Sequence, residues 1–223
     1  MISPSATSPA LTTIEDNGYF FRTAPSDARQ GQVLADMMKD QGITEIAVTY
    51  TNNDYGKGLA DSFQAAFEAA GGKVSISVPH EDGKGDYSAE VATLAATGSK
   101  ELAVFGYVDQ GGRGIIQSAL DTGAFDKFVL CDGMIGDSLL EAFGDSLNGT
   151  IGTLPGNDGE GATKFLELAK AKGIDGSGAF APESYDAAAL LMLAMEAAGS
   201  TDRAAIQAKV LDVANGPGEP ILP

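Results

Sequence analysis

The sequence predicts an α/β fold in which a parallel β-sheet is covered by helices on both faces. Runs of β-branched and apolar residues alternate with segments of helical periodicity from residue 23 to residue 152. One run, at residues 102–105, is continuously apolar, as in strands that are buried on both faces. After Pro155 the strand signal ends and three helical segments follow. Alternation of this kind is typical of βαβ units, whose strands are parallel.

The predicted elements follow one another in a regular order. Residues 3–13, rich in Ser, Thr and Pro, predict a loop, and residues 19–23 predict a short strand. Asp27 followed by Gln30 resembles a capping box, which predicts a helix over residues 28–41. Further strands are predicted at residues 45–50, 73–78, 102–105, 128–130 and 150–154. Helices are predicted between them, at residues 59–70, 87–96, 115–120 and 139–143.

The last part of the chain is predicted to be helical, at residues 162–172, 184–198 and 203–214. The middle helix is apolar nearly all round, so we expect it to be buried, although this part supplies no sheet of its own to cover it. We therefore expect three regions. Residues 23–152 form a complete lobe, and residues 1–22 and the helical residues 153–223 form parts of another lobe.

Composition excludes several classes of partner. The chain has 31 acidic and 14 basic residues and a formal charge of −17, which repels nucleic acid and anionic lipid. Cys131 is the only cysteine, so no disulfide forms within this stretch, and with a single histidine we expect neither a metal site nor a cofactor. No apolar run approaches the roughly 18 residues of a membrane span, so direct insertion into a membrane is not expected.

Candidate ligand-binding residues follow the predicted strands, where ligands gather in open α/β sheets. Tyr55 follows the strand at residues 45–50, Tyr107 the strand at 102–105, and Asp132 the strand at 128–130. A carboxylate flanked by tyrosine hydroxyls suits an ammonium group, because charge-assisted hydrogen bonds are strong. Structural roles remain open: Tyr107 as a packed aromatic residue and Asp132 as part of a turn.

A second candidate group is the loop that contains Ser5, Ala6 and Thr7. Its short hydroxyls and free backbone amides are suited to a carboxylate. Together with Asp132, this loop would complete a clamp for a zwitterion, with the carboxylate on one lobe and the ammonium largely on the other.

Catalytic patterns in the sequence are incomplete, so we expect no enzyme. Gly-Asp-Ser-Leu occurs at residues 136–139 and 144–147, and it matches the nucleophile block of a lipase-like hydrolase family. That family also requires a histidine near the C-terminus, whereas the only histidine here, His80, lies upstream. Cys131 has no neighbouring histidine, and neither a dinucleotide-binding nor a P-loop glycine motif is present.

Several blocks resemble the branched-chain amino-acid group of type I periplasmic binding proteins, the leucine/isoleucine/valine-binding protein-like group. They are MISPSATSPALT and YFFRTAPSDARQ near the N-terminus, then NDYGKGLADSF, GYVDQGG and ESYDAAALLMLAMEAAGS, in that order. The resemblance implies a Venus-flytrap receptor of two doubly wound parallel-sheet lobes joined by crossovers. It assigns one crossover to residues 1–22 and the start of a return crossover to the end of residues 153–223, with the first lobe incomplete in this chain. It assigns the ligand's carboxylate and ammonium to Ser5, Ala6 and Thr7, and it places Tyr55 and Tyr107 at family tyrosines. Asp132 falls where leucine-binding relatives carry a glutamate for the ammonium.

The resemblance also implies the setting in which the protein acts. We expect an amino-acid ligand, an ABC permease in the inner membrane as partner, and a periplasmic location. Relatives extend beyond both ends of this stretch, so the chain is expected to be a fragment, with a signal peptide in the part that precedes it. The alternatives are the same fold binding an amide, a urea or an aromatic acid, or acting as a ligand-sensing domain.

Overall fold

The computed structural model describes residues 1–156 and 159–218, which divide into two compact units. Unit 1 comprises Met1–Thr7, Thr13–Pro25 and the chain from Pro155 onward. Unit 2 comprises Ser8–Thr12 and Ser26–Leu154. Residues 1–22, predicted as one region, are therefore divided between the two units. The reason is that the 3-10 turn Pro9–Thr12 contacts a helix of unit 2. The sequence predicts the start of a return crossover toward residue 223. From residue 219 on, this segment lies outside the described residues.

Unit 2 is built on a five-stranded parallel sheet in the order β4-β3-β5-β6-β7. The strands are β3 (Glu45–Thr51), β4 (Lys73–His80), β5 (Glu101–Phe105), β6 (Lys127–Leu130) and β7 (Ile151–Gly152). The side chains of Leu102, Val104 and Phe105 in the central strand β5 are completely buried. Burial of successive residues requires cover on both faces of the sheet, as the sequence predicts.

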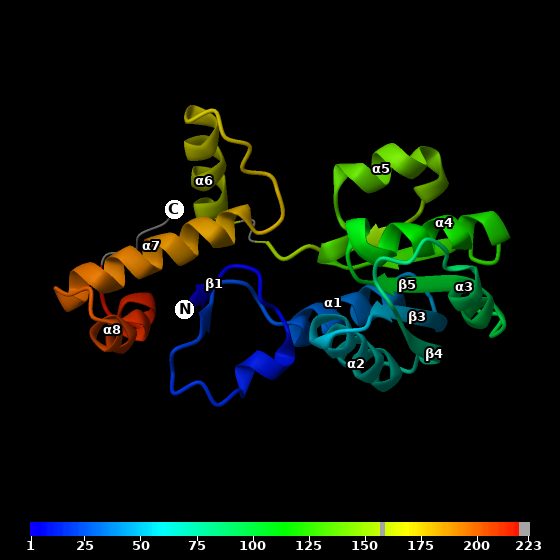
Figure 1. Ribbon diagram of the computed structural model, residues 1–223, viewed down its shortest axis with the longest axis horizontal. Helices are drawn as coiled ribbons and strands as arrows, with labels where there is room; N and C mark the ends of the chain where they lie inside the picture. The colour runs from blue at the N-terminus through cyan, green and yellow to red at the C-terminus, as the bar shows by residue number, and fades with distance from the viewer. Residues whose placement is uncertain (157–158, 219–223) are drawn as a thin grey trace. The chain divides into compact units, whose positions relative to one another are not determined.

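Helices supply that cover (Figure 1). They are α1 (Asp27–Asp40), α2 (Asp54–Ala69), α3 (Ser88–Ala95), α4 (Arg113–Thr122) and α5 (Asp137–Phe143). The chain moves from β3 outward to β4 and then back across the sheet to β5, β6 and β7. Right-handed crossovers in these two directions place α1 and α2 on one face and α3 and α4 on the other (Figure 1). The predicted doubly wound arrangement is therefore present in unit 2.

The start of α1 differs from the predicted capping box. Ser26 is the N-cap, with an extended backbone and a side-chain oxygen that accepts from the amide of Ala28. Asp27 lies inside the first turn and is buried. The Gln30 side chain donates to the backbone oxygen and the hydroxyl of Thr153, at 3.3 and 3.0 Å, so it ties α1 to the end of β7.

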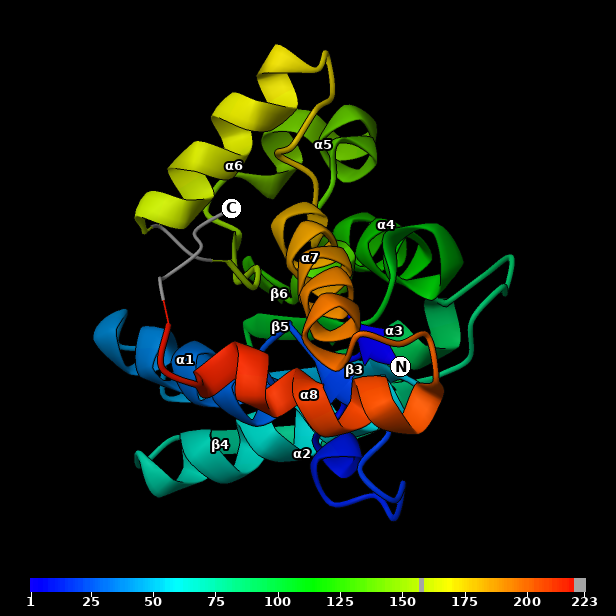
Figure 2. The ribbon, with the colours of Figure 1, turned by 90° about the vertical axis from the view of Figure 1, so that its left-hand side faces the viewer.

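Unit 1 has a two-stranded parallel sheet and three helices. The strands β1 (Ile2–Ser3) and β2 (Phe21–Arg22) pair with each other, and the helices are α6 (Glu160–Ala171), α7 (Ala181–Ala198) and α8 (Arg203–Asn215). In Figure 2, α8 runs beside the C-terminal part of α7, which it contacts. Among the described residues, no helix has both the length and the apolar character needed to cross a membrane.

The predicted burial of the apolar helix α7 is wrong. Only Glu183, Ala187 and Ala194 are buried, whereas Leu191 and Met192 are 42% and 63% exposed. The physical reason is the small area of the β1–β2 pair, which covers one side of α7 at most. The fifth strand of unit 2 is also shorter than predicted, at Ile151–Gly152.

Replacing Gly31 with alanine is predicted to destabilise unit 2, because α1 and α2 approach each other closely there. A Cβ on Gly31 would lie 2.6 Å from the backbone nitrogen of Phe63. A backbone atom cannot rotate away, so overpacking of roughly 1–3 kcal/mol outweighs the gain in helix propensity of about 1 kcal/mol. We expect Gly31→Ala to lower the free energy of unfolding by up to about 2 kcal/mol in urea titrations.

Gly85→Ala is the matched control for this prediction. Its Cβ would have no neighbour within 4 Å, and the backbone there does not require glycine. Its free energy of unfolding should stay within about 0.5 kcal/mol of the parent chain. Equal stability of the two variants would contradict the close approach of α1 and α2.

Candidate functional site

Three of the predicted ligand-binding residues meet at the carboxyl end of the unit 2 sheet. Tyr55 lies in the first turn of α2, after β3, while Tyr107 follows β5 and Asp132 follows β6. These three strands are neighbours in the sheet. The Tyr55 hydroxyl donates to Asp132 Oδ1 at 2.9 Å. The Tyr55 and Tyr107 rings stack with centroids 5.2 Å apart and an interplanar angle of 30°. We call these three residues the tyrosine–aspartate site.

The position of Tyr55 follows from a tight turn between β3 and α2. Asn53 caps the helix, because its side-chain oxygen accepts from the amide of Gly56 at 2.9 Å. A Cβ on Gly56 would lie 2.3 Å from the carbonyl oxygen of Thr51, so only glycine allows the helix to start this close to the strand. The turn thereby holds Tyr55 beside the strand ends.

Asp132 is placed by a second close approach. A Cβ on Gly133 would lie 2.2 Å from the carbonyl oxygen of Gly106 and 3.1 Å from the ring of Tyr107. Glycine at position 133 therefore lets the segment after β6 lie against the segment after β5. Asp132 itself is only 6% exposed. The Asp132-Gly133 turn, one of the structural alternatives, thus also brings the carboxylate to the two tyrosines.

Cys131 is a member of this cluster that sequence reasoning did not include. Its sulfur accepts from the Tyr55 hydroxyl at 3.2 Å and from the Gly106 amide at 3.3 Å. It is completely buried, as predicted for a small residue at a strand end. The position directly before Asp132 is the only sequence signal that could have revealed its role. A thiol without access to solvent serves here as a hydrogen-bonding partner rather than a nucleophile.

The electrostatics of the site favour neutral hydroxyls around one carboxyl group. Burial, together with nearby Cys131 and Asp132, raises the pKa of Tyr55 far above its ordinary value. Burial also raises the pKa of Tyr107, against a hydrogen bond with Asn53 that lowers it. Both phenols therefore remain protonated at neutral pH and can donate hydrogen bonds.

The other predicted ligand-binding residues, Ser5, Ala6 and Thr7, belong to unit 1. They follow β1, and the Ser3 hydroxyl accepts from the amides of Ala6 and Ser5 at 3.1 and 3.4 Å. The expectation of free amides in this loop is therefore wrong for two of them, because the preceding serine occupies both. Arg22 Nη1 donates to the carbonyl oxygen of Ala6 at 3.4 Å, which brings a guanidinium group to the loop.

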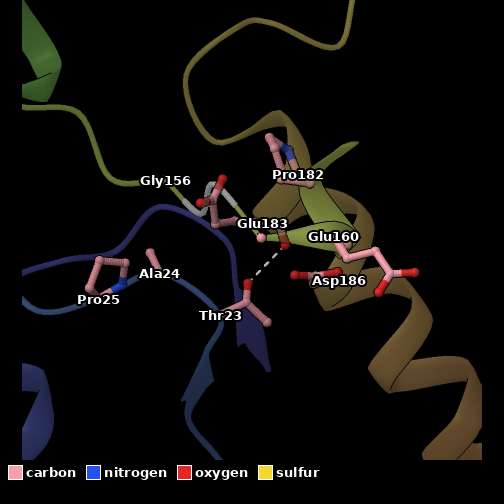
Figure 3. A pocket seen from close by; sticks show the side chains of 11 residues that line it. Thr23, Ala24, Pro25, Gly156, Glu160, Pro182, Glu183 and Asp186 are labelled. Atoms are coloured by element: carbon pink, nitrogen blue, oxygen red, sulfur yellow. Dashed lines mark hydrogen bonds between the residues drawn. The ribbon is translucent and has the colours of Figure 1, made fainter. Parts of the chain in front are cut away.

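Unit 1 also contains a cavity of about 630 Å³ that sequence reasoning did not anticipate (Figure 3). Glu160, Glu183 and Asp186 line it, and the Thr23 hydroxyl donates to the carbonyl oxygen of Glu183 at 2.8 Å. Burial raises the pKa of Asp186. Three carboxyl groups make this cavity a poor match for an anionic group. In the sequence, this cavity is indicated by the acidic residues within the otherwise apolar segment at residues 181–198.

Metal coordination has no support in the described part of the chain. No group of three or more His, Cys, Asp or Glu side chains there lies close enough to hold a metal ion. The tyrosine–aspartate site therefore offers hydrogen bonding, a carboxyl group and aromatic surface. These are the properties of a binding site for a small polar molecule.

The family described as "Periplasmic binding protein" matches residues 1–214. The chain belongs to this family. Its fold is the type I periplasmic binding protein fold, with parallel α/β sheets.

Two relatives of this periplasmic binding protein are named for the amino acids that they bind. Leu/Ile/Val-binding protein homolog 3 of Brucella melitensis is 32% identical over 95% of this chain and 57% of its own length. A leucine-, isoleucine-, valine-, threonine- and alanine-binding protein of Pseudomonas aeruginosa is 31% identical over 91% of this chain and 54% of its own. The chain thus spans about half the length of the curated relatives it matches.

A solved structure shows the same fold in three dimensions. The crystal structure of a leucine-binding protein from Thermotoga maritima matches with a TM-score of 0.82 at 27% identity. The match covers 94% of this chain and 61% of that protein.

Cys131 is predicted to resist alkylation in the folded chain. Burial and the neighbouring Asp132 raise the pKa of its thiol to about 12. Roughly one thiol in ten thousand is then ionised at pH 8, and the thiolate is the reactive form. We expect iodoacetamide to label the native chain at pH 8 at least about a thousandfold more slowly than the unfolded chain.

The same chain unfolded in guanidinium chloride is the control for this measurement. Because the sequence has one cysteine, the mass of the product reports Cys131 alone. Native labelling at a rate similar to that of the unfolded chain would show that the thiol is exposed, and would contradict the packing of the site.

Proposed function

We propose that this protein is the extracytoplasmic solute-binding receptor of an ABC importer, and that it captures an aliphatic amino acid. The observation that supports the proposal most is the hydrogen bond between Tyr55 and Asp132 at the carboxyl end of the unit 2 sheet. A buried carboxylate held in a fixed direction by a neutral donor is well placed to accept a cation, because charge-assisted hydrogen bonds are strong.

The ammonium group of the ligand is assigned to Asp132. In the described part of the chain, the ion pairs are formed by other acidic residues, and Asp132 has no lysine or arginine partner among them. A buried carboxylate without a cation is costly, and a ligand ammonium would remove that cost. The stacked rings of Tyr55 and Tyr107 would cover the apolar part of the ligand.

The carboxylate of the ligand is assigned to Ser5, Ala6 and Thr7. Short hydroxyls and backbone amides donate hydrogen bonds to such a group, and Ser3 would release its two amide donors as the ligand binds. The names of the relatives, which include leucine, isoleucine and valine, support an aliphatic side chain.

The proposed setting follows from the family. The receptor would act outside the cytoplasm, with a signal peptide on the full-length protein, and would present its ligand to a membrane permease. It would carry out no chemical reaction. The hydroxyls of the tyrosine–aspartate site and the thiol of the neighbouring Cys131 are held protonated, so none of them is an activated nucleophile.

Asp132→Asn is predicted to weaken leucine binding about a hundredfold, because it removes the charge that the ammonium needs while keeping the shape. Calorimetric titration of the full-length protein with leucine measures the change. 4-Methylpentanoate lacks the ammonium, so its weaker binding should be affected by less than about threefold. Benzoate is included to test for an aromatic-acid receptor.

The control is Asp137→Asn, which removes an exposed carboxylate in the segment that follows Asp132. It should leave the dissociation constant for leucine unchanged. If the parent protein binds benzoate but no amino acid, the ligand assignment is wrong. If leucine binds equally well to Asp132→Asn, Asp132 does not hold the ammonium.

A further inference from the structure

His80, the only histidine of the chain, lies buried beside the segment that carries Tyr107. It is the last residue of β4, and its Nδ1 lies 2.9 Å from the hydroxyl of Thr49 in β3. Its ring meets the ring of Tyr87 edge to face, with centroids 6.2 Å apart. The function proposed above assigns no role to His80.

Two glycines leave the space that the imidazole occupies. A Cβ on Gly106 would lie 3.2 Å from His80 Nε2, and a Cβ on Gly111 would lie 2.9 Å from its Cδ2. Gly106 directly precedes Tyr107, and Gly111 lies within the π-helical turn Val108–Gly112 that follows Tyr107. The imidazole therefore packs against both ends of the segment that positions Tyr107.

The loop after His80 also holds this segment. The Gly83 amide donates to the carbonyl oxygen of Gln110 at 3.2 Å. The Tyr87 hydroxyl donates to the carbonyl oxygen of Glu81 at 2.9 Å, which fixes the loop itself. The segment that carries Tyr107 thus rests on a surface formed by the end of β4 and the loop that follows it.

The surroundings of the His80 ring favour its neutral form. Among the described residues, His80 Nε2 and Asp82 Oδ1 are buried without a hydrogen-bond partner. The other oxygen of Asp82 accepts from the Thr51 hydroxyl at 2.6 Å. Burial lowers the pKa of His80, against the opposing charges of Asp82, Glu90 and Glu81. Tyr87 is the other titratable group that contacts the ring.

We propose that His80 is the positioning residue of the tyrosine–aspartate site: its neutral imidazole holds the segment that carries Tyr107, and a proton on the ring loosens that segment. A protonated imidazole has N–H donors on both nitrogens. The donor at Nε2 faces Gly106, which offers it no side-chain acceptor. The turn must then open to water, or Asp82 must swing toward the ring and displace Gly111. Either movement releases Tyr107 from its stacked position on Tyr55.

Proton NMR of the 223-residue chain tests this coupling without a ligand. The single histidine gives one unambiguous imidazole signal. We expect that signal to titrate with a midpoint below about 6.5, and the ring signals of Tyr107 to shift with the same midpoint. If His80 titrates while the signals of Tyr107 stay unchanged, the inference is wrong.

His80→Gln, which has no titratable ring, is the comparison variant. In the parent chain the unfolded state binds the proton first, so the free energy of unfolding should fall as the pH drops below about 6.5. This component should be absent from His80→Gln, together with the shift of the Tyr107 signals. A Tyr107 shift of the same size and midpoint in His80→Gln would overturn the inference.

A double-mutant cycle tests the packing directly. Gly106→Ala should displace the Tyr107 signals, because its Cβ meets the imidazole, and His80→Ala should restore them in large part by vacating that space. Gly85→Ala, whose Cβ meets nothing within 4 Å, is the control. Equal displacement of the Tyr107 signals by Gly106→Ala in the presence and absence of His80 would contradict the contact.

The effect on the ligand rests on the proposed function. Leucine affinity should fall about tenfold between pH 7.5 and pH 5 in the parent protein, a common size for coupling between two sites, and should change less than about twofold in His80→Gln. If leucine does not bind at any pH, the proposed function fails, whereas the NMR titration still decides the role of His80. If leucine binds with equal affinity at both pH values, the inference about His80 is wrong, whereas the proposed function is unaffected.

Discussion

The hydrogen bond from the Tyr55 hydroxyl to the Asp132 carboxylate is the interaction on which the proposed binding site depends. It joins the start of α2 to the segment after β6, across the end of β5 that lies between them in the sheet. Burial makes the bond strong and also makes the carboxylate costly, since Asp132 has no basic partner among the described residues. A site with these properties gains free energy when a ligand supplies a positive charge, and loses its organisation when either partner is removed.

This bond forms because the backbone segments at the strand ends approach unusually closely. Gly56 lets α2 begin against Thr51, and Gly133 lets the segment after β6 lie against Gly106. The Cys131 sulfur fills the space beneath, where it accepts from both Tyr55 and the Gly106 amide. The imidazole of His80 also lies close to Gly106, in the segment after β5. Uncharged residues thus fix the position of Asp132, so the binding residues need to move little when a ligand binds.

The sequence predicts this part of the molecule well because strand ends in a parallel sheet meet at one edge. Tyr55, Tyr107 and Asp132 each follow a strand, so their proximity was predictable from the order of elements. The cap of α1 was not, because the choice between Ser26 and Asp27 depends on which side chain is buried by tertiary packing. The exposure of Leu191 and Met192 depends on the area of sheet in unit 1, which the composition of α7 does not reveal. The contacts of Cys131 and His80 depend on distances between loops.

The measurement that tests this account most directly is a double-mutant cycle on Tyr55→Phe and Asp132→Asn, with the free energy of leucine binding to the full-length protein as the readout. The account predicts that each change alone weakens binding and that the second change costs much less after the first. The coupling energy should be about 1–3 kcal/mol, because the two groups act as one hydrogen-bonded unit. Free energies that add within about 0.5 kcal/mol would contradict the account, because Tyr55 and Asp132 would then act independently on the ligand.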